Sequence, residues 1–434
     1  MTSRVAVPAA TSLPSRHREA EVRGERLARP LRLMTRQFGS VDETLMDRLG
    51  ESLLERDELA ARLVAAMRLA ATDPAKVTHS QLQTALASGV EAMRDAPPAL
   101  VEFFAAVNTT PDWVDWELVE RGALVFDRLG ANSGDILLAL SLIGGYRFGG
   151  PTELLAATGA LTGDSTQRRL AETQSWVLGL MQPGALRPGA EGWRQTVHVR
   201  VMHALVNANF EDGWDVDRIG LPINQSDQAG TLGLFDGALL VGCRSLGVPI
   251  SRADAHAVMH LWKYTGWLMG VDADFLTDDE DVRHRLNLHI LVSAPDQTQA
   301  GRDLARATVA TQCTRKYGHR SERLNRWRGE YEYERLLSML TVMLGPRSMR
   351  DLGLPIRPPW AYAARLATNT WRYRVTGRGV RGRTRLERQG KATQWRDHAT
   401  YLQVGVEDGV ADLPDAPARH ASPTRARGEQ DPCT

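Results

Sequence analysis

Apolar residues recur at spacings of three and four along most of the chain, which is the period of an amphipathic helix. The pattern starts near Val41, continues through Leu45, Leu49 and Leu53, and stops at Pro74. Strand-like alternation is weak and short, so we predict an all-α fold. Further helices are expected over residues 79–94, 97–107, 115–129, 165–182, 193–211, 229–247, 251–269, 277–292, 296–310, 331–344 and 358–371.

The predicted helices follow one another without a repeat of fixed period. They are therefore expected to form a single large multi-helix domain over residues 40–372. Residues 1–36 and 375–434 lack apolar periodicity. The first segment is predicted to be a disordered basic arm, and the second a disordered tail that is first basic and then rich in Pro and Ala.

The charge balance excludes a general nucleic-acid binder. With 53 basic and 52 acidic residues the formal net charge is +1, so no overall field attracts a polyanion. The ends are more basic, because residues 1–36 hold eight Arg against three Glu. A weak contact of these ends with an anionic membrane surface stays open, with a solvated tail as the default.

Targeting signals are absent from the sequence pattern. The N-terminal stretch has no apolar core of signal-peptide length, and the longest apolar run, Ile136 to Gly145, is about half a membrane span. The three Cys residues are widely spaced and predict no disulfide framework. These features predict a cytoplasmic protein without a membrane span.

Candidate chemistry is concentrated between residues 153 and 203. Arg169 and Thr173 lie four residues apart and share one face of a predicted helix. Arg200 and His203 lie three apart and share a face of the next one. Since a short turn joins the two helices, we expect antiparallel neighbours whose polar faces look into one interior.

His203 stands among apolar neighbours in the stretch VRVMHALV, residues 199–206. A buried imidazole is costly unless it binds something, and neutral imidazole is a common ligand of haem iron. The guanidinium of Arg200, one turn away, would suit a haem propionate. On spacing alone, a core histidine bonded to a backbone carbonyl is the more frequent outcome.

Six stretches resemble the MpaB/latex-clearing oxygenase family, in the family's order across residues 110–271. They are TPDWVDWELVERG at 110–122, GGPTELLAATGAL at 149–161, RRLAETQSWV at 168–177, VRVMHALV at 199–206, GLPINQSDQAGTLGLF at 220–235 and LWKYTGWLMGV at 261–271. The resemblance implies an all-helical protein that binds a non-covalent b-type haem, in keeping with the lack of a CxxCH motif. It also implies O₂ as co-substrate.

The resemblance assigns roles to individual residues. His203 falls on the proximal ligand of the haem iron, and Arg200 on the Arg one turn before it. Arg169 and Thr173 match the Arg and Thr of the family's first motif, and Glu153 matches a carboxylate used as a base near the distal pocket. These assignments predict His203, Arg200 and Arg169 as cofactor-binding residues, and Glu153, Arg169 and Thr173 as catalytic residues.

One position departs from the rubber-cleaving members, which carry a Lys just before the Thr. This chain has Glu172 there. A carboxylate would ligate iron poorly and reverses the local charge, so the substrate and the resting iron coordination are left undetermined.

Other motifs have simpler interpretations. His256 and His260 form an H-x-x-x-H pair without a third ligand, so a satisfied or exposed helical pair is expected. His284 and His289 are expected on the surface. Cys243, in an apolar helix, is expected to be a structural thiol.

The sequence thus predicts a haem b-dependent oxygenase that uses O₂ to oxidise or cleave a hydrophobic, unsaturated, isoprenoid or lipid-like substrate. Two alternatives stay open: a haem-binding carrier or sensor on the same scaffold, and a helical interaction protein that has lost haem. The substrate and the oligomeric state are not predicted.

Overall fold

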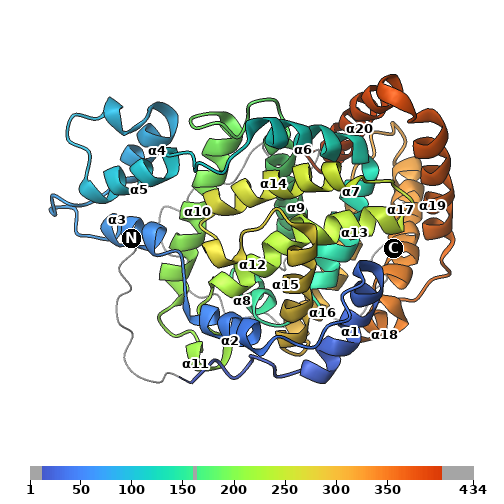
Figure 1. The fold of residues 1–434 in the computed structure, drawn as a ribbon, viewed down its shortest axis with the longest axis horizontal. Helices are drawn as coiled ribbons and strands as arrows, with labels where there is room; N and C mark the ends of the chain where they lie inside the picture. Colours follow the sequence, from blue (N-terminus) through green and yellow to red (C-terminus); the bar gives the residue numbers. More distant parts are fainter. Residues whose placement is uncertain (1–11, 160–163, 403–434) are drawn as a thin grey trace.

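The computed structural model describes residues 12–159 and 164–402. Every regular element in these two ranges is a helix, as predicted (Figure 1). The long helices are α1 (Glu21–Thr35), α6 (Trp116–Leu129), α9 (Asp164–Leu180), α10 (Glu191–Phe210), α12 (Gln225–Phe235), α14 (Arg252–Leu268), α15 (Glu280–Ser293), α16 (Gln299–Thr314), α17 (Glu322–Met343), α19 (Trp360–Trp371) and α20 (Gly379–Leu402).

Shorter helices connect and cover these. They are α2 (Glu43–Glu51), α3 (Glu58–Met67), α4 (His79–Ser88), α5 (Pro98–Asn108), α7 (Ala131–Ile136), α8 (Pro151–Ala157), α11 (Val216–Ile219), α13 (Gly237–Ser245) and α18 (Gly345–Asp351). The 3₁₀ turns are η1 (Ser52–Leu54), η2 (Val90–Ala92) and η4 (Ala273–Phe275), and the π-helical segments are η3 (Leu137–Ile143) and η5 (Arg372–Thr376).

The pair α6 and α14 forms the central contact of the fold. Each helix begins at a side-chain cap: Asp115 accepts from the amides of Glu117 and Leu118, and Ser251 accepts from that of Asp254. The two backbones meet at Gly122, where a Cβ atom would stand 2.4 Å from a carbonyl oxygen of α14.

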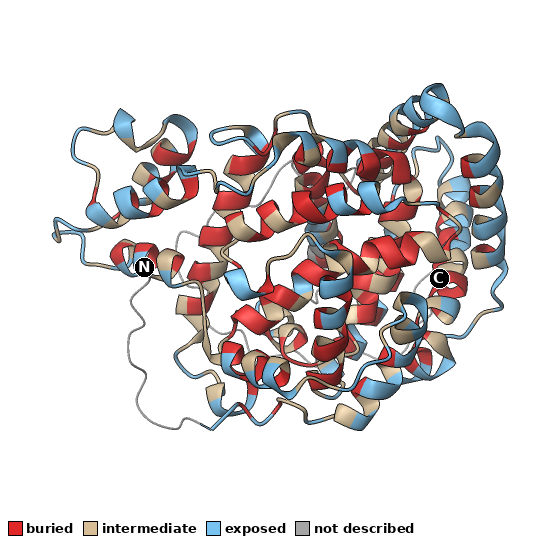
Figure 2. Cartoon of the chain, in the orientation of Figure 1, coloured by how far each residue is buried: buried red, intermediate tan, exposed pale blue. Residues whose placement is uncertain are grey.

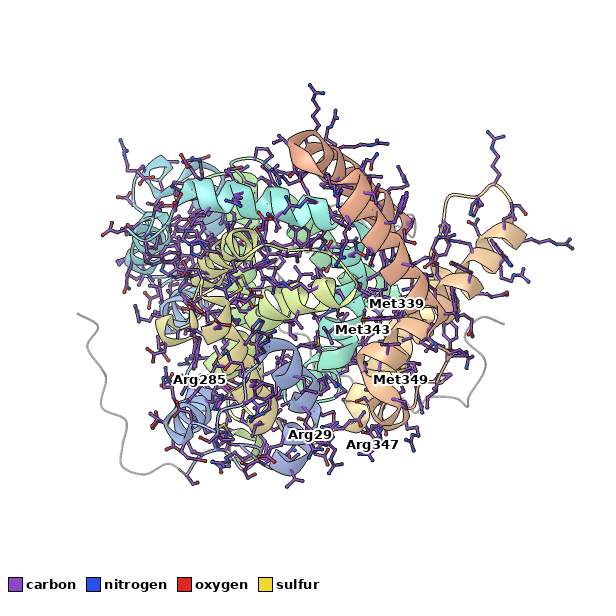
Figure 3. All side chains as sticks on the ribbon, turned by 45° about the vertical axis from the view of Figure 1, so that its right-hand side comes forward. Arg29, Arg285, Met339, Met343, Arg347 and Met349 are labelled. Carbon is purple, nitrogen blue, oxygen red and sulfur yellow. The ribbon has the colours of Figure 1, made fainter. Side chains whose placement is uncertain are left out.

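Burial is concentrated in the middle of the molecule (Figure 2). The largest core includes the fully enclosed side chains of Phe103, Trp193, Trp262 and Tyr264. A second core packs η3 against α16, α17 and α18. Met349 of α18 is buried in this second core, whereas Met339 of α17 is buried in the largest core; both are marked in Figure 3.

The prediction of a disordered C-terminal tail from residue 375 is wrong over α20. This helix packs on α6 and α9 through a stripe at intervals of three or four: Leu386, Gly390, Gln394, His398 and Tyr401. Only two of the five are large and hydrophobic, so the stripe escapes a search for apolar periodicity. The rest of the predicted tail, residues 403–434, lies outside the described residues.

The predicted disordered arm, residues 1–36, is likewise wrong over α1. This helix packs on α15, and its buried residues are Gly24 and Ala28. A Cβ at position 24 would stand 2.4 Å from the carbonyl oxygen of Leu291, so the contact is between backbones. Because the contact residues are small and stand among many arginines, this helix also shows no apolar periodicity in the sequence. Residues 1–11 lie outside the described residues.

Two cysteines bear on the earlier expectations. Cys243 is a buried free thiol, and burial raises its pKa, which fits a structural role. Cys313, on α16, is disulfide-bonded, although the wide spacing of the three cysteines predicted no disulfide framework.

Candidate functional site

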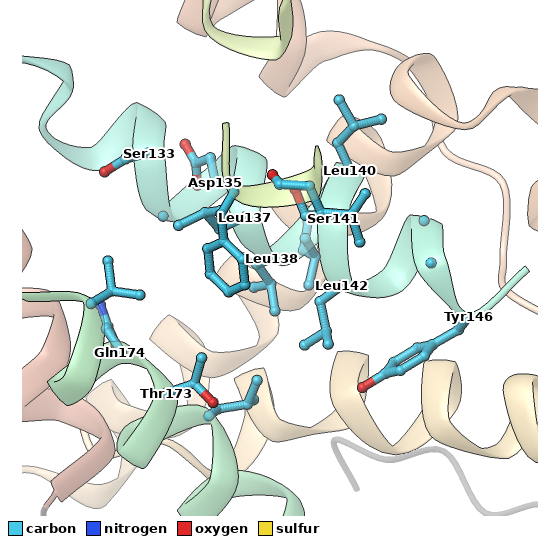
Figure 4. Close-up of a pocket in the computed structure, with 18 of the residues that line it drawn as sticks. Ser133, Asp135, Leu137, Leu138, Leu140, Ser141, Leu142, Tyr146, Thr173 and Gln174 are labelled. Carbon is cyan, nitrogen blue, oxygen red and sulfur yellow. The ribbon is translucent and has the colours of Figure 1, made fainter. Parts of the chain in front are cut away.

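A large cavity of about 1050 Å³ lies between η3 and α9. Leucines of the π-helical segment η3 line one side, and Thr173, Gln174 and Val177 of α9 face them (Figure 4). π-Helical segments widen the local helix and occur often at functional sites. The cavity therefore has an apolar wall and a more polar one, and its volume is at the upper end of the usual range for cofactor and ligand sites.

Most charges in the cavity wall are paired. Asp135 binds Arg335 and Arg365 at 2.9 and 2.6 Å. Burial acts to raise the pKa of Asp135, but these two guanidinium groups hold it below its usual value. Arg315 binds Asp397 of α20 at 2.6 Å. The first two pairs join α7 to α17 and α19, and the third joins the C-terminal end of α16 to α20.

Arg169 is different. It lines the large cavity from α9, one turn before Thr173, and has no hydrogen-bond or ion-pair partner among the residues that the structure describes. Withdrawal from water lowers its pKa, against the attraction of Tyr146 and Glu172. The side chain is exposed, so water can solvate it without a protein partner. Because an arginine remains charged in proteins, it is available to bind an anionic group in the cavity.

His203 lies on α10 and lines a separate cavity of about 230 Å³. Its Nδ1 is shielded from solvent and has no hydrogen-bond partner among the described residues. Burial, and next the charge of Arg169, lower the pKa of His203 to about 4. The imidazole is therefore neutral at physiological pH, which is the form that binds a metal.

Arg200, one turn before His203, already has a partner. Its guanidinium forms a two-point ion pair with Asp57, the N-cap of α3, at 2.5 and 2.8 Å. It also donates to the carbonyl of Leu268 and stacks over Phe103. Sequence reasoning missed Asp57, because a partner 143 residues away leaves no local signal.

The predicted neighbours α9 and α10 do touch, since Trp176 Nε1 donates to Thr196 Oγ1 at 3.1 Å. However, they do not present their polar faces to one cavity. Arg169 and Thr173 line the large cavity, whereas Arg200 and His203 line the small one. The two cavities flank α12: Asp227 lines the large one and Gln228 the small one.

Glu153 and Glu172 stand outside both cavity walls. The Glu153 carboxylate accepts from the amide of Gly150 at 2.9 Å at the start of α8, and it pairs with Arg218 at 2.8 Å. Glu172 is half-buried, and burial raises its pKa despite Arg169 and Arg168.

The other histidines have structural roles. His260 accepts from the amide of Asp115 through Nε2 and contacts Asp278 through Nδ1 at 2.8 Å, as expected of a satisfied pair. His284 and His289 are buried, so their predicted surface position is wrong; His289 Nε2 accepts from the amide of Asp42. Among described residues, no group of three or more His, Cys, Asp or Glu side chains could hold a metal ion.

Comparison with known proteins now gives a context for these residues. Residues 128–382 match the sequence profile of the family described as "ER-bound oxygenase mpaB/B'/Rubber oxygenase, catalytic domain". A solved structure of latex clearing protein in the closed state is 18% identical, with a TM-score of 0.49, and the alignment covers 79% of this chain and 95% of that one. None of the curated proteins matches. Because the profile covers more than half of the sequence, the chain belongs to the mpaB and rubber oxygenase family.

Proposed function

We propose that this protein is a haem b-dependent oxygenase that uses O₂ to oxidise or cleave a hydrophobic, unsaturated, isoprenoid or lipid-like substrate. The observation that carries the proposal is the neutral, half-buried imidazole of His203, whose Nδ1 is shielded from solvent and has no partner among the described residues. A polar atom in this position costs free energy unless a ligand satisfies it.

The surrounding residues fit a haem in their chemistry. The imidazole offers a ligand for iron, and the unpaired Arg169 offers a cation for a propionate. Arg200 lines the same cavity as His203, with a guanidinium already ordered by Asp57. The 230 Å³ cavity beside His203 is below the usual size of a cofactor site, so it would have to widen to hold a haem.

Bound haem supplies iron that binds and activates O₂. The chain supplies the rest. Burial keeps His203 unprotonated and available for iron across the physiological range. The leucines of η3 offer an apolar wall to a hydrophobic substrate, and Thr173 places one hydroxyl opposite that wall.

Glu153 keeps its proposed role as a base only if its carboxylate leaves Arg218 and the amide of Gly150. Glu172 has a raised pKa and lies one residue from the cavity wall, so it is the nearer carboxylate to Thr173 along α9. The structure therefore gives Glu153 a capping role first, and any proton transfer by it requires a rearranged α8.

The test is the spectrum of the purified protein made with ample haem. We expect a Soret band and release of haem by acid–acetone, since the chain has no CxxCH motif. O₂ uptake is then measured with a panel of terpenes and unsaturated lipids, and the products are identified by mass spectrometry. Absence of a Soret band contradicts the proposal; haem without O₂ uptake across the panel indicates a carrier or sensor.

A further inference from the structure

An exposed aromatic surface lies on α17 and α19, the helices at the right of Figure 1. We call it the α17–α19 face. Leu324, Trp327 and Tyr331 stand at intervals of three and four on α17, and Trp360 and Trp371 stand at the two ends of α19. Trp327 is 61% exposed and Trp371 is 66% exposed. Large aromatic groups in this position mark an interaction surface rather than a core.

The aromatic rings on this face are ordered by one another. Trp327 stacks on Tyr331 with ring centroids 6.2 Å apart, and Tyr331 stands 5.7 Å from Trp360. Arg328 lies over the Tyr331 ring at 5.2 Å. The rings therefore form a fixed row that joins α17 to α19.

This row borders an opening of the large cavity. Tyr331 and Trp360 are exposed, and both also line the cavity, together with Ala364 and Thr368 of α19. The same two side chains therefore face the surface and the interior. A lipophilic molecule that arrives at the α17–α19 face meets an aromatic rim and then the leucines of η3.

Basic side chains flank the face, and the exposed Glu322 and Glu330 of α17 offset part of their charge. Arg320, Arg323 and Arg326 precede or begin α17, and Arg374 and Arg378 follow α19. All five are exposed, and none forms an ion pair within the described part of the chain. Exposed Trp with flanking Arg is the composition that favours the headgroup region of an anionic bilayer.

We propose that the α17–α19 face docks on an anionic membrane surface and admits a lipophilic substrate from the bilayer between Tyr331 and Trp360. The identity of the cargo rests on the proposed function, but the docking does not. A second copy of the chain is a poor occupant, because two such faces would bring arginines against arginines. Among the described residues, no helix has the length and hydrophobicity to cross a bilayer, so the contact is peripheral.

The experiment is vesicle flotation of the full chain. We expect it to float with vesicles of phosphatidylcholine and phosphatidylglycerol, and roughly tenfold less with phosphatidylcholine alone. The double variant Trp327→Ala/Trp371→Ala should lose roughly tenfold or more in partitioning, since two exposed indoles no longer insert. The matched control is Phe38→Ala, which removes a 68% exposed aromatic ring between α1 and α2 and should float like the wild type.

Three outcomes overturn the proposal. One is a wild-type chain that does not float, and another is equal loss in the double variant and in Phe38→Ala. The third is a dimer, detected by light scattering, that the double variant abolishes while flotation is absent. Haem content is read separately from the Soret band. Flotation without haem therefore refutes only the proposed function, and haem without flotation refutes only the docking.

Discussion

The two cavities differ in how their charged groups are satisfied. In the small cavity the arginine is paired and the imidazole is not: Arg200 holds Asp57, while His203 Nδ1 has no partner among the described residues. In the large cavity the carboxylates are paired, and the arginine of α9 is not. In each cavity one group is thus left to bind a ligand. In the small cavity it is the neutral imidazole of His203, and in the large cavity it is the guanidinium of Arg169.

This difference distinguishes the paired charges, which stabilise the fold, from the unpaired groups, which are available to a ligand. The pairs Arg200–Asp57 and Asp135–Arg335 hold helices together, and breaking a buried pair leaves an uncompensated charge. The shielded Nδ1 of His203 adds nothing of this kind to the fold, and it has a free-energy cost unless a ligand satisfies it. Arg169 is exposed, so it stays solvated without a partner and remains available to an anionic group.

The largest expected effect is on stability, and it comes from removing the helix that forms one wall of the large cavity. Ending the chain at Arg378 removes α20, which supplies Gln394, Asp397 and Tyr401 to the cavity wall. We expect loss of cooperative thermal unfolding, because α6 and α9 then expose the surface that α20 covers. A chain ending at Leu402 is the control, because it lacks the same residues 403–434 but keeps α20; it should still unfold cooperatively. A soluble, cooperative protein without α20 would show that this wall is dispensable.

The next effect is on the small cavity. His203→Ala should lower the ratio of haem to protein at least roughly tenfold, since it removes the iron ligand. His256→Ala, at a half-exposed histidine on α14, is the control and should leave the ratio unchanged. Measurement is by absorbance after haem reconstitution. Equal haem loss in both variants, or no loss in His203→Ala, would show that His203 is not the iron ligand.

The two arginines allow the sharpest comparison. Arg200→Met leaves Asp57 unpaired and should lower the free energy of unfolding of the haem-free protein by about 3 kcal/mol. Arg169→Met removes an unpaired cation and should change it by less than about 0.5 kcal/mol. Urea unfolding measures both. If the two variants lose equal stability, Arg169 has a structural partner and is not reserved for a ligand.

Much of the helical fold was predictable, because apolar periodicity reports which face is buried. The expected segments 165–182 and 193–211 correspond to α9 and α10, and 251–269 to α14. The expected single helix over 229–247 is two helices, broken at Asp236. The first three turns of α17 were missed because their exposed face mixes Arg with Trp.

The candidate site was predictable only in part. Spacing placed Arg169 with Thr173, and Arg200 with His203, on shared helix faces, and the structure keeps both pairs. It could not show that the two pairs line different cavities. Nor could it show that Asp57 holds Arg200, since that contact depends on tertiary packing between distant segments. Local spacing determines which residues share a helix face. Which groups that face contacts depends on how the whole chain packs.

The smallest effect concerns Asp127, under the helix that closes the large cavity. It lies on α6, where a Cβ at Gly390 of α20 would stand 1.9 Å from its carbonyl oxygen. Its carboxyl group is buried, and the nearest cation, Lys391, is 3.9 Å away. Burial raises the pKa of Asp127 to about 6; Lys391 opposes this rise and Glu387 adds to it.

This shift fixes the sign of a pH effect. The folded state holds the proton more tightly than the unfolded state, so the carboxyl group favours folding at low pH, and this advantage is lost as the pH rises from about 4 through 6. Asp127→Asn should therefore stabilise the protein by about 2 kcal/mol at pH 8 and make little difference at pH 4. Urea midpoints at the two pH values test this. A variant that is less stable at pH 8 would show that the charged Asp127 holds α20 in place through Lys391.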